Sequence, residues 1–143
     1  MNSPKDDVKN KVWAYFKKMQ NVFLATADLD QPKVRPVTML YYNDRFWIGT
    51  GTGDAKIRQI EQNENVEFCL LVKGENTTGY IRGTGKAVII EDAATRKLLA
   101  DAMPYFKDFW NDPADPRFTL LEMIIQQIEF MEPGKITVER FSV

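Results

Sequence analysis

Short turns between strand-like segments restrict the fold of this chain more than any other sequence feature. Asp28-Leu29-Asp30-Gln31 joins a segment over residues 21–27 to one over 32–42, and Asn43-Asp44 joins that one to residues 45–50. The second segment is rich in Val, Thr and Tyr, which favour extended strands. Turns this short leave no room for a crossover helix, so the three predicted strands must pair antiparallel as a meander.

The rest of the chain adds more strands and a few short helices. Further strands are predicted over residues 66–72, 77–90, 118–132 and 136–141, and helices over residues 55–62 and after Asp92. Residues 66–72 are almost wholly apolar, which predicts a strand buried on both faces. Six or seven mostly antiparallel strands predict a mainly β fold with a few short helices, and a closed β-barrel fits them best.

A first helix is predicted from a capping pattern near the N-terminus. Ser3 followed by Pro4 is typical of an N-cap with proline at the first helical position. Apolar residues at helical spacing then predict one buried face, made by Val8, Val12, Tyr15, Phe16 and Met19. We expect this amphipathic helix to pack over the end of the sheet.

The strand predicted over residues 77–90 has two distinct faces. Polar side chains such as Arg82 alternate with apolar ones such as Ile81. Gly83 and Gly85 both fall on the apolar face. Glycines in a strand indicate a tight bend or a close backbone approach, as in a small closed barrel.

Length and charge limit the classes of protein to which the chain can belong. Its 143 residues are enough for one domain of ordinary size, and we expect a single domain over residues 1–143. Nineteen basic and twenty acidic residues leave a net charge of −1, which predicts no binding to nucleic acid or to anionic membranes. No apolar run is long enough for a membrane helix, and Met1–Asp7 does not resemble a signal peptide. We therefore expect a cytoplasmic protein.

Histidine and cysteine usage excludes several kinds of active site. The chain has no His, which excludes Ser-His-Asp triads, HExxH zinc sites and His ligation of haem. Its single Cys excludes a disulfide framework within the chain and fits a reducing compartment. Cys69 lies in an apolar strand and is expected to be inert packing. No metal site and no catalytic side chain is identified from the sequence.

The most informative motif is Gly49-Thr50-Gly51-Thr52-Gly53-Asp54-Ala55-Lys56, in which a strand leads through glycines into a helix. Backbone N–H groups at a helix start, together with the positive end of the helix dipole, bind phosphate. The glycines allow a close approach, and Lys56 adds a charge. The spacing matches neither a P-loop nor a dinucleotide-binding fingerprint. The alternative is a flexible turn with a solvated lysine.

Arg35 is the second candidate for an anion site. On a strand over residues 32–42 it shares a face with Val37 and Met39. A charge in an apolar row needs a partner, because an unpaired buried charge is very costly. That partner could be a ligand phosphate shared with Lys56; the alternatives are a structural ion pair or an arginine that reaches solvent at the barrel rim.

Trp110 is a third candidate, set in an aromatic cluster with Tyr105, Phe106 and Phe109. It could stack on a planar ligand or fill a subunit interface. Clusters of this kind are more often core.

These segments resemble the FMN-binding split-barrel superfamily, which includes pyridoxamine 5′-phosphate oxidase. The resemblance runs from about Asn21 to Glu132. Its most specific pieces are Val34-Arg35-Pro36-Val37, the segment from Thr50 through Lys56 to Asn63, and Gly85-Lys86-Ala87. Trp110-Asn111-Asp112-Pro113-Ala114-Asp115-Pro116 resembles the W…DP loop of the smaller, general-stress-protein branch. The resemblance implies a six- to seven-stranded antiparallel split β-barrel, usually a homodimer with FMN at the interface.

The same resemblance implies a set of flavin-binding positions. It assigns Arg35 and Lys56 to the FMN phosphate, residues 36–38 to the strand beside the isoalloxazine, and Tyr80 to a position donated by the other subunit. The implied set is Arg35, Pro36, Val37, Thr38, Gly49, Thr50, Lys56, Tyr80 and Trp110.

Several positions depart from the oxidase pattern. Leu40 replaces a second flavin-contacting lysine, and Asp54-Ala55 replaces Ser-Arg. An acid at position 54 repels phosphate unless it caps the helix instead. The sequence also ends at Val143 without the basic segment that holds the oxidase substrate, so pyridoxamine-phosphate oxidation is not expected.

The function predicted first is a flavin-dependent oxidoreductase that acts on a small-molecule redox substrate. Flavin carries the redox chemistry itself, so the absence of His is no obstacle. The alternative is a protein that binds, stores or senses a flavin, a deazaflavin or haem without turnover, as in a stress response. A third alternative is a small-barrel interaction domain with no cofactor.

Overall fold

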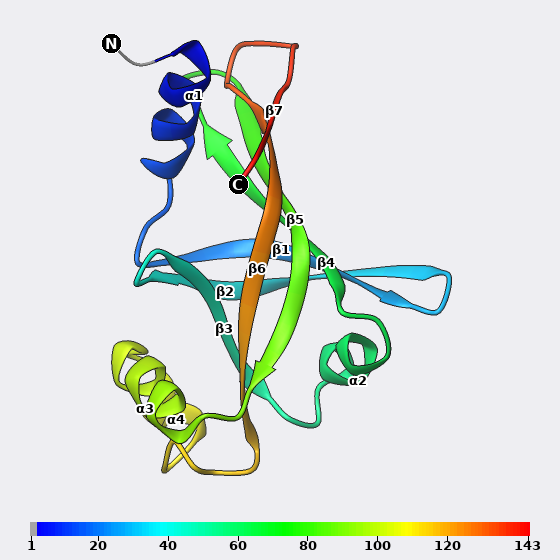
Figure 1. The fold of residues 1–143 in the computed structure, drawn as a ribbon, viewed down its shortest axis with the longest axis vertical. Coiled ribbons are helices and arrows are strands. Elements are labelled where there is room, and N and C mark those ends of the chain that lie inside the picture. The colour runs from blue at the N-terminus through cyan, green and yellow to red at the C-terminus, as the bar shows by residue number, and fades with distance from the viewer. Residues whose placement is uncertain (1–2) are drawn as a thin grey trace.

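The structure is a computed structural model that describes residues 3–143, so Met1 and Asn2 of the segment Met1–Asp7 considered above lie outside the described residues. Seven strands form one sheet in the order β3-β2-β1-β4-β5-β6-β7, and β3 also pairs with β6. Six strands therefore close into a ring, with β7 outside it (Figure 1). Every pairing is antiparallel, which confirms the split barrel and the opening meander. The strands are β1 (Met19–Asp28), β2 (Gln31–Tyr42), β3 (Arg45–Gly51), β4 (Asn65–Lys73), β5 (Thr78–Ile90), β6 (Phe118–Met131) and β7 (Glu139–Ser142).

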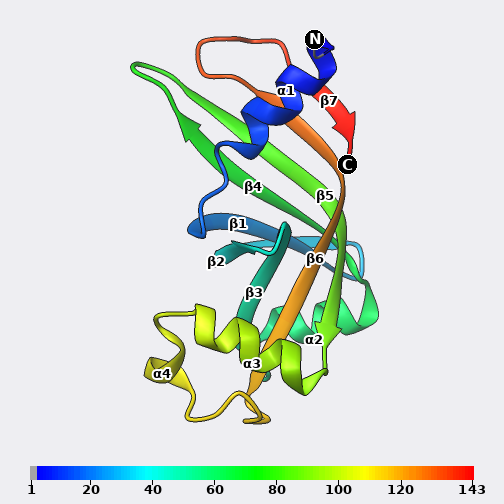
Figure 2. The same ribbon diagram turned by 60° about the vertical axis from the view of Figure 1, so that its left-hand side comes forward.

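The helices lie at opposite ends of the barrel. They are α1 (Pro4–Trp13), α2 (Ala55–Gln62), α3 (Ala93–Ala102) and α4 (Phe106–Phe109). Figures 1 and 2 both show α1 beside β7 at one end, and α2, α3 and α4 at the other. None of the helices within residues 3–143 is long and apolar enough to cross a membrane.

The start of α1 is as predicted, but its end is not. Ser3 caps the helix by accepting the backbone N–H of Asp6, and Pro4 is the first helical residue. The predicted apolar face extends too far, because α1 ends at Trp13 and Met19 already belongs to β1. After the helix, the Gln20 side chain holds the turn that leads into β1: its amide donates to the Tyr15 carbonyl, and its oxygen accepts the Lys17 N–H. Tyr15 and Phe16 pack on the core from this turn rather than from the helix.

The barrel encloses one large hydrophobic cluster, and α3 and α4 cover a second, smaller one at the end of the barrel. The prediction that residues 66–72 are buried on both faces is wrong. Burial alternates along β4: Phe68 and Leu70 point inward, whereas Leu71 is 50% exposed and Cys69 is half-buried. The outward side chains have this exposure because no other part of residues 3–143 covers that face of the barrel.

Gly83 and Gly85 have the role predicted for them. A Cβ at Gly83 would overlap the Phe68 ring, and one at Gly85 would overlap the Ile124 carbonyl. The register of β5 against β6 shifts between Thr84 and Gly85, which is a β-bulge. Bulges bend a strand and increase its twist, so these glycines let β5 curve around the barrel.

Candidate functional site

A pocket of about 950 Å³ lies between the start of α2 and the aromatic helix α4. We call it the α2–α4 pocket. Seven of the nine residues predicted to hold a cofactor line it: Pro36, Val37, Thr38, Gly49, Thr50, Lys56 and Trp110. They come from β2, β3, α2 and the residue that follows α4, and the ring closure through β3 and β6 brings them together. Arg35 and Tyr80 do not line it.

One end of the α2–α4 pocket carries its charge. Lys56, whose side chain is 12% exposed, donates from Nζ to Asp54 Oδ2 at 3.0 Å. The Thr50 hydroxyl donates to the same oxygen at 2.6 Å. The Thr50 hydrogen bond, followed by Lys56, holds the pKa of the Asp54 carboxyl below its ordinary value of 3.8. Asp54 is therefore an anion at neutral pH, and it partly neutralises Lys56.

Asp54 occupies the N-cap position of α2, but its side chain makes no capping hydrogen bond. The carboxylate is turned instead toward Thr50 and Lys56. Among the residues that the structure describes, no side chain accepts from the first backbone N–H groups of α2. Such groups are available to an anion.

Gly53 leaves open space beside this helix start. A Cβ at Gly53 would meet nothing within 4 Å, and its backbone φ lies outside the left-handed region. Neither packing within the chain nor backbone geometry requires a glycine here. The position keeps the backbone accessible where a ligand would approach it.

Arg35 lies behind the wall of the pocket, on β2. Its Nη2 donates to Gln59 Oε1 at 2.9 Å, and its Nη1 donates to the Leu24 carbonyl at 3.1 Å. Gln59 follows Lys56 by three residues on α2, so Arg35 contacts that helix at a position that neighbours Lys56. Burial lowers the pKa of Arg35 from its ordinary value, yet an arginine stays protonated. Within residues 3–143 no carboxylate forms an ion pair with it, so the structural ion pair considered for Arg35 is not formed.

Tyr80 lies on the outer face of β5, away from the α2–α4 pocket. Its hydroxyl donates to Glu129 Oε2 at 2.7 Å. Arg82 and Arg140 also bond Glu129, at 2.6 and 2.8 Å. The Tyr80 hydrogen bond, followed by the two arginines, keeps the pKa of Glu129 below its ordinary value of 4.5.

The other end of the pocket is aromatic. Trp110 is 8% exposed and packs on Phe106 and Phe118, with ring centroids 5.3 and 4.9 Å apart, so most of it is core. Phe109 is 67% exposed beside it. Tyr105 lines the same wall, and its buried hydroxyl has no hydrogen-bond partner.

Sequence reasoning missed part of this wall. Asn21 lines the pocket and accepts a hydrogen bond from Thr38, and Arg117 brings a cation that pairs with Asp115 at 2.9 Å. Arg117 follows the Asp-Pro loop directly, but only the pairing of β3 with β6 places it beside α2. Tyr105 was visible in the aromatic cluster, but its unpartnered hydroxyl was not.

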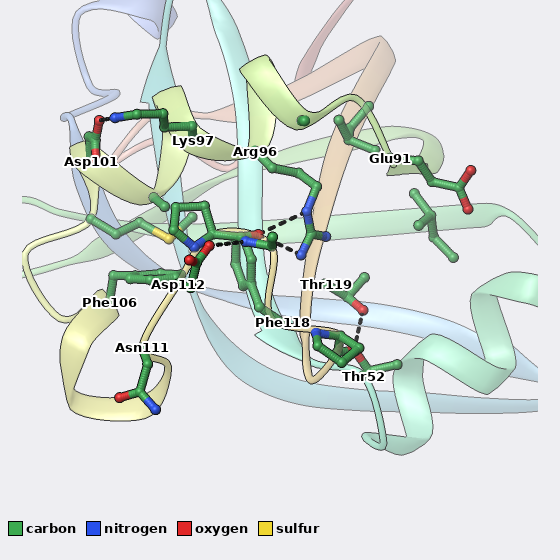
Figure 3. A pocket seen from close by; sticks show the side chains of 18 of the residues that line it. Thr52, Glu91, Arg96, Lys97, Asp101, Phe106, Asn111, Asp112, Phe118 and Thr119 are labelled. Atoms are coloured by element: carbon green, nitrogen blue, oxygen red, sulfur yellow. Dashed lines mark hydrogen bonds and ion pairs between the residues drawn. The ribbon is translucent and has the colours of Figure 1, made fainter.

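A second cavity, of about 1030 Å³, lies between α3 and the loop before β6. We call it the α3 groove. Figure 3 shows Arg96 at its centre, bonded to the loop. Arg96 donates twice to the Pro113 carbonyl and once to that of Asp115, and its guanidinium lies 4.8 Å from the centroid of the Phe118 ring. The arginine thus holds the loop. Within residues 3–143 no group of three or more metal-ligating side chains is present in either cavity or elsewhere.

Several solved structures are similar to this one. A NimC/NimA family protein from Clostridium acetobutylicum is 24% identical, with a TM-score of 0.75, over 94% of this chain and 91% of that one. General Stress Protein 26 from Bacillus anthracis str. Sterne is 22% identical, with a TM-score of 0.69, over 95% and 98%. A heme binding protein from Mycobacterium smegmatis is 14% identical, with a TM-score of 0.77, over 99% and 59%. At these identities the similarity shows the fold alone.

A search of curated protein sequences gives no match. The family model for pyridoxamine 5′-phosphate oxidase matches residues 9–132, which include every strand of the closed ring. The match covers most of the sequence and agrees with the split barrel described above. The chain belongs to the pyridoxamine 5′-phosphate oxidase family.

Proposed function

We propose that this protein binds FMN in the α2–α4 pocket and acts as a flavin-dependent oxidoreductase on a small-molecule redox substrate. One observation carries the proposal: a single pocket joins a nearly buried lysine and an uncapped helix start to an aromatic wall. FMN has the same two parts, a phosphate and a planar ring. The volume, about 950 Å³, suits a cofactor of this size.

The phosphate would bind at the start of α2. Lys56 supplies the charge, Gly53 leaves room, and the first N–H groups of the helix donate. A phosphate monoester carries about −1.5 to −2 charges near neutral pH and would compete with Asp54 for Lys56. Arg35 acts from behind the helix: it adds positive potential and fixes Gln59, which also accepts the Thr26 hydroxyl at 2.5 Å.

The ring would lie between β2 and the aromatic wall. The backbone of residues 36–38 forms one side, and Trp110 with Phe109 forms the other. Bound FMN would supply hydride and electron transfer. The residues of this chain position the ring, provide hydrogen-bond partners and limit solvent.

We further propose that two copies pair over the outer face beside the pocket. Phe23, 44% exposed, lies opposite Pro36 on β2 and Cys69 on β4. Leu71, 50% exposed, lies opposite Tyr80 on β5. This apolar face is continuous with the pocket, because Pro36 belongs to both. A partner seated there would cover the open side of the flavin and would bring Tyr80 into the second site.

The test is the visible spectrum of the purified protein, followed by mass analysis of any small molecule released on denaturation. We expect a flavin spectrum and the mass of FMN. A colourless protein that also leaves FMN fluorescence unquenched on titration would overturn the proposal.

A second function is supported by the chemistry of the pocket walls. Asp54 is held as an anion, and burial raises the pKa of Tyr105 above its ordinary value of 10.0, so neither group exchanges protons readily near neutral pH. Neither hydride transfer at flavin nor storage of a flavin, a deazaflavin or haem requires such a group, so the same walls would serve a protein that binds the cofactor without turnover. Reduction of bound FMN by NAD(P)H faster than that of free FMN supports the oxidoreductase, and no reduction by any donor supports the carrier.

A further inference from the structure

Among the side chains lining the α2–α4 pocket, one buried polar atom has no partner within residues 3–143: the hydroxyl oxygen of Tyr105. The other polar side chains at the charged end satisfy one another, as Thr50, Asp54 and Lys56 show. Buried hydroxyl groups in native proteins are nearly always hydrogen-bonded, and each exception needs an explanation.

The surroundings of Tyr105 indicate where its partner comes from. The residue lies between α3 and α4 and packs on the second hydrophobic cluster, so its inner side meets apolar groups. Its nearest aromatic neighbour in the pocket wall is Phe109, with ring centroids 6.4 Å apart. Phe109 is 67% exposed and can move aside when a ring enters. The hydroxyl oxygen is closed to solvent in this structure, so a ligand in the α2–α4 pocket reaches it only when Phe109 has moved aside.

We propose that the Tyr105 hydroxyl donates a hydrogen bond to an acceptor atom on the edge of the bound flavin ring and thereby selects a flavin over a porphyrin. The proposal rests on the proposed flavin site. A flavin ring carries carbonyl oxygens and ring nitrogens along its edge, whereas the rim of the haem porphyrin is hydrocarbon except for its two propionate groups. A site with a buried donor rejects a ligand that leaves the donor unpaired.

The protonation state of Tyr105 agrees with a donor role. Burial raises the pKa of its phenol above the ordinary value, so the group keeps its proton near neutral pH. The ionisable groups that share the pocket wall, Asp54, Lys56, Asp108 and Arg117, form no hydrogen bond with it. A neutral phenol donates a hydrogen bond well and is a poor ligand for haem iron, which binds tyrosine as the phenolate.

The test compares Tyr105→Phe with Tyr42→Phe. Tyr42 packs on the same hydrophobic cluster but does not line the pocket, so it is a matched control. Each variant is titrated with FMN and with haemin, and the melting temperature of each ligand-free protein is measured. We expect Tyr105→Phe to weaken FMN binding roughly 2- to 12-fold, as for one neutral hydrogen bond. We expect it to leave haemin binding unchanged or tighter, and to keep or raise the melting temperature.

The outcomes separate this inference from the proposed function. If the unmodified protein binds no FMN, the flavin site itself is wrong and this inference fails with it. If the unmodified protein binds FMN and Tyr105→Phe binds it equally well, only the role of Tyr105 is overturned. A lower melting temperature for ligand-free Tyr105→Phe, with Tyr42→Phe unaffected, would show that the hydroxyl has a partner within the protein. Loss of haemin binding on Tyr105→Phe would make the residue an iron ligand instead.

Discussion

The α2–α4 pocket and the α3 groove have similar volumes, about 950 and 1030 Å³, but their polar atoms are used differently. In the α3 groove, the guanidinium of Arg96 donates its hydrogen bonds to backbone carbonyls of the neighbouring loop. In the α2–α4 pocket, a hydroxyl has no partner and a glycine faces open space. The comparison teaches that a polar atom without a hydrogen-bond partner, and space that no side chain fills, distinguish the candidate binding site here. The volume of the cavity does not distinguish it.

The largest expected effect tests the charged end of the α2–α4 pocket. We expect Arg35→Ala with Lys56→Ala to weaken FMN binding about 100-fold, because the charge-assisted hydrogen bond from Lys56, about 1.5–3 kcal/mol, and the positive potential of Arg35 behind the helix are both lost. Riboflavin, which lacks the phosphate, serves as the control and should bind both proteins alike. Fluorescence titration gives both affinities, and circular dichroism checks that the double variant is folded. Equal losses for FMN and riboflavin would mean that these cations do not bind the phosphate.

The next effect tests the α3 groove. We expect Arg96→Ala to lower the free energy of unfolding by about 2–4 kcal/mol, because three hydrogen bonds and the contact with Phe118 are lost. Urea denaturation measures this change. FMN affinity should stay within a factor of about two. If FMN binding is lost while stability is unchanged, the two cavities have been assigned the wrong way round.

Gly53→Ala tests the open space in the α2–α4 pocket, and its expected effects are smaller. An alanine should raise the free energy of unfolding by about 0.4–1 kcal/mol, because the folded backbone accepts it and the unfolded chain loses freedom. The same methyl group would fill the space beside the start of α2 and should weaken FMN binding about fivefold, or ~1 kcal/mol. Thermal melts and FMN titration on the same samples measure the two changes. A variant that is more stable and binds FMN normally would show that the ligand does not approach Gly53.

The smallest expected effect concerns Asp54 and pH. Its folded pKa lies below 3.8, so its contribution to stability is present above pH 3.8 and is lost as pH falls through the lower folded value. Because the side chain is 51% exposed, this contribution should be under about 1 kcal/mol. The stability difference between the unmodified protein and Asp54→Asn, measured by urea denaturation, should therefore shrink below pH 3.8.

The same variant should bind FMN more tightly at neutral pH, because Lys56 loses the Asp54 carboxylate that competes with the phosphate. A stability difference independent of pH would contradict the role given to Asp54.

Much of the fold could be predicted from the sequence, because short turns and alternating side chains act locally. Asn43-Asp44 forces an antiparallel pair whatever the rest of the chain does, and it joins β2 to β3 as expected. The predictions were wrong where the burial of a residue depends on parts of the chain that are distant in sequence. Leu71 is exposed because β4 turns one face outward from a closed ring, and an apolar run cannot show on which side the core lies.

The candidate site likewise has a part that could be predicted from the sequence and a part that could not. Residues 36–38, Gly49, Thr50 and Lys56 line one pocket, since they follow one another along a meander that ends at a helix. The partners of single polar atoms could not be predicted, because they depend on pairings across the barrel. Arg35 donates to Gln59 and to the Leu24 carbonyl, whereas the Tyr105 hydroxyl has no hydrogen-bond partner within residues 3–143. No local pattern distinguishes the two cases.

The most direct test of the proposed flavin site compares FMN with riboflavin on the unmodified protein, titrated side by side at the same pH and salt concentration. A phosphate seated on Lys56 and the start of α2 predicts that FMN binds at least about tenfold more tightly, equivalent to one charge-assisted hydrogen bond. Equal affinities, or no quenching of either fluorescence, would contradict a phosphate site in the α2–α4 pocket.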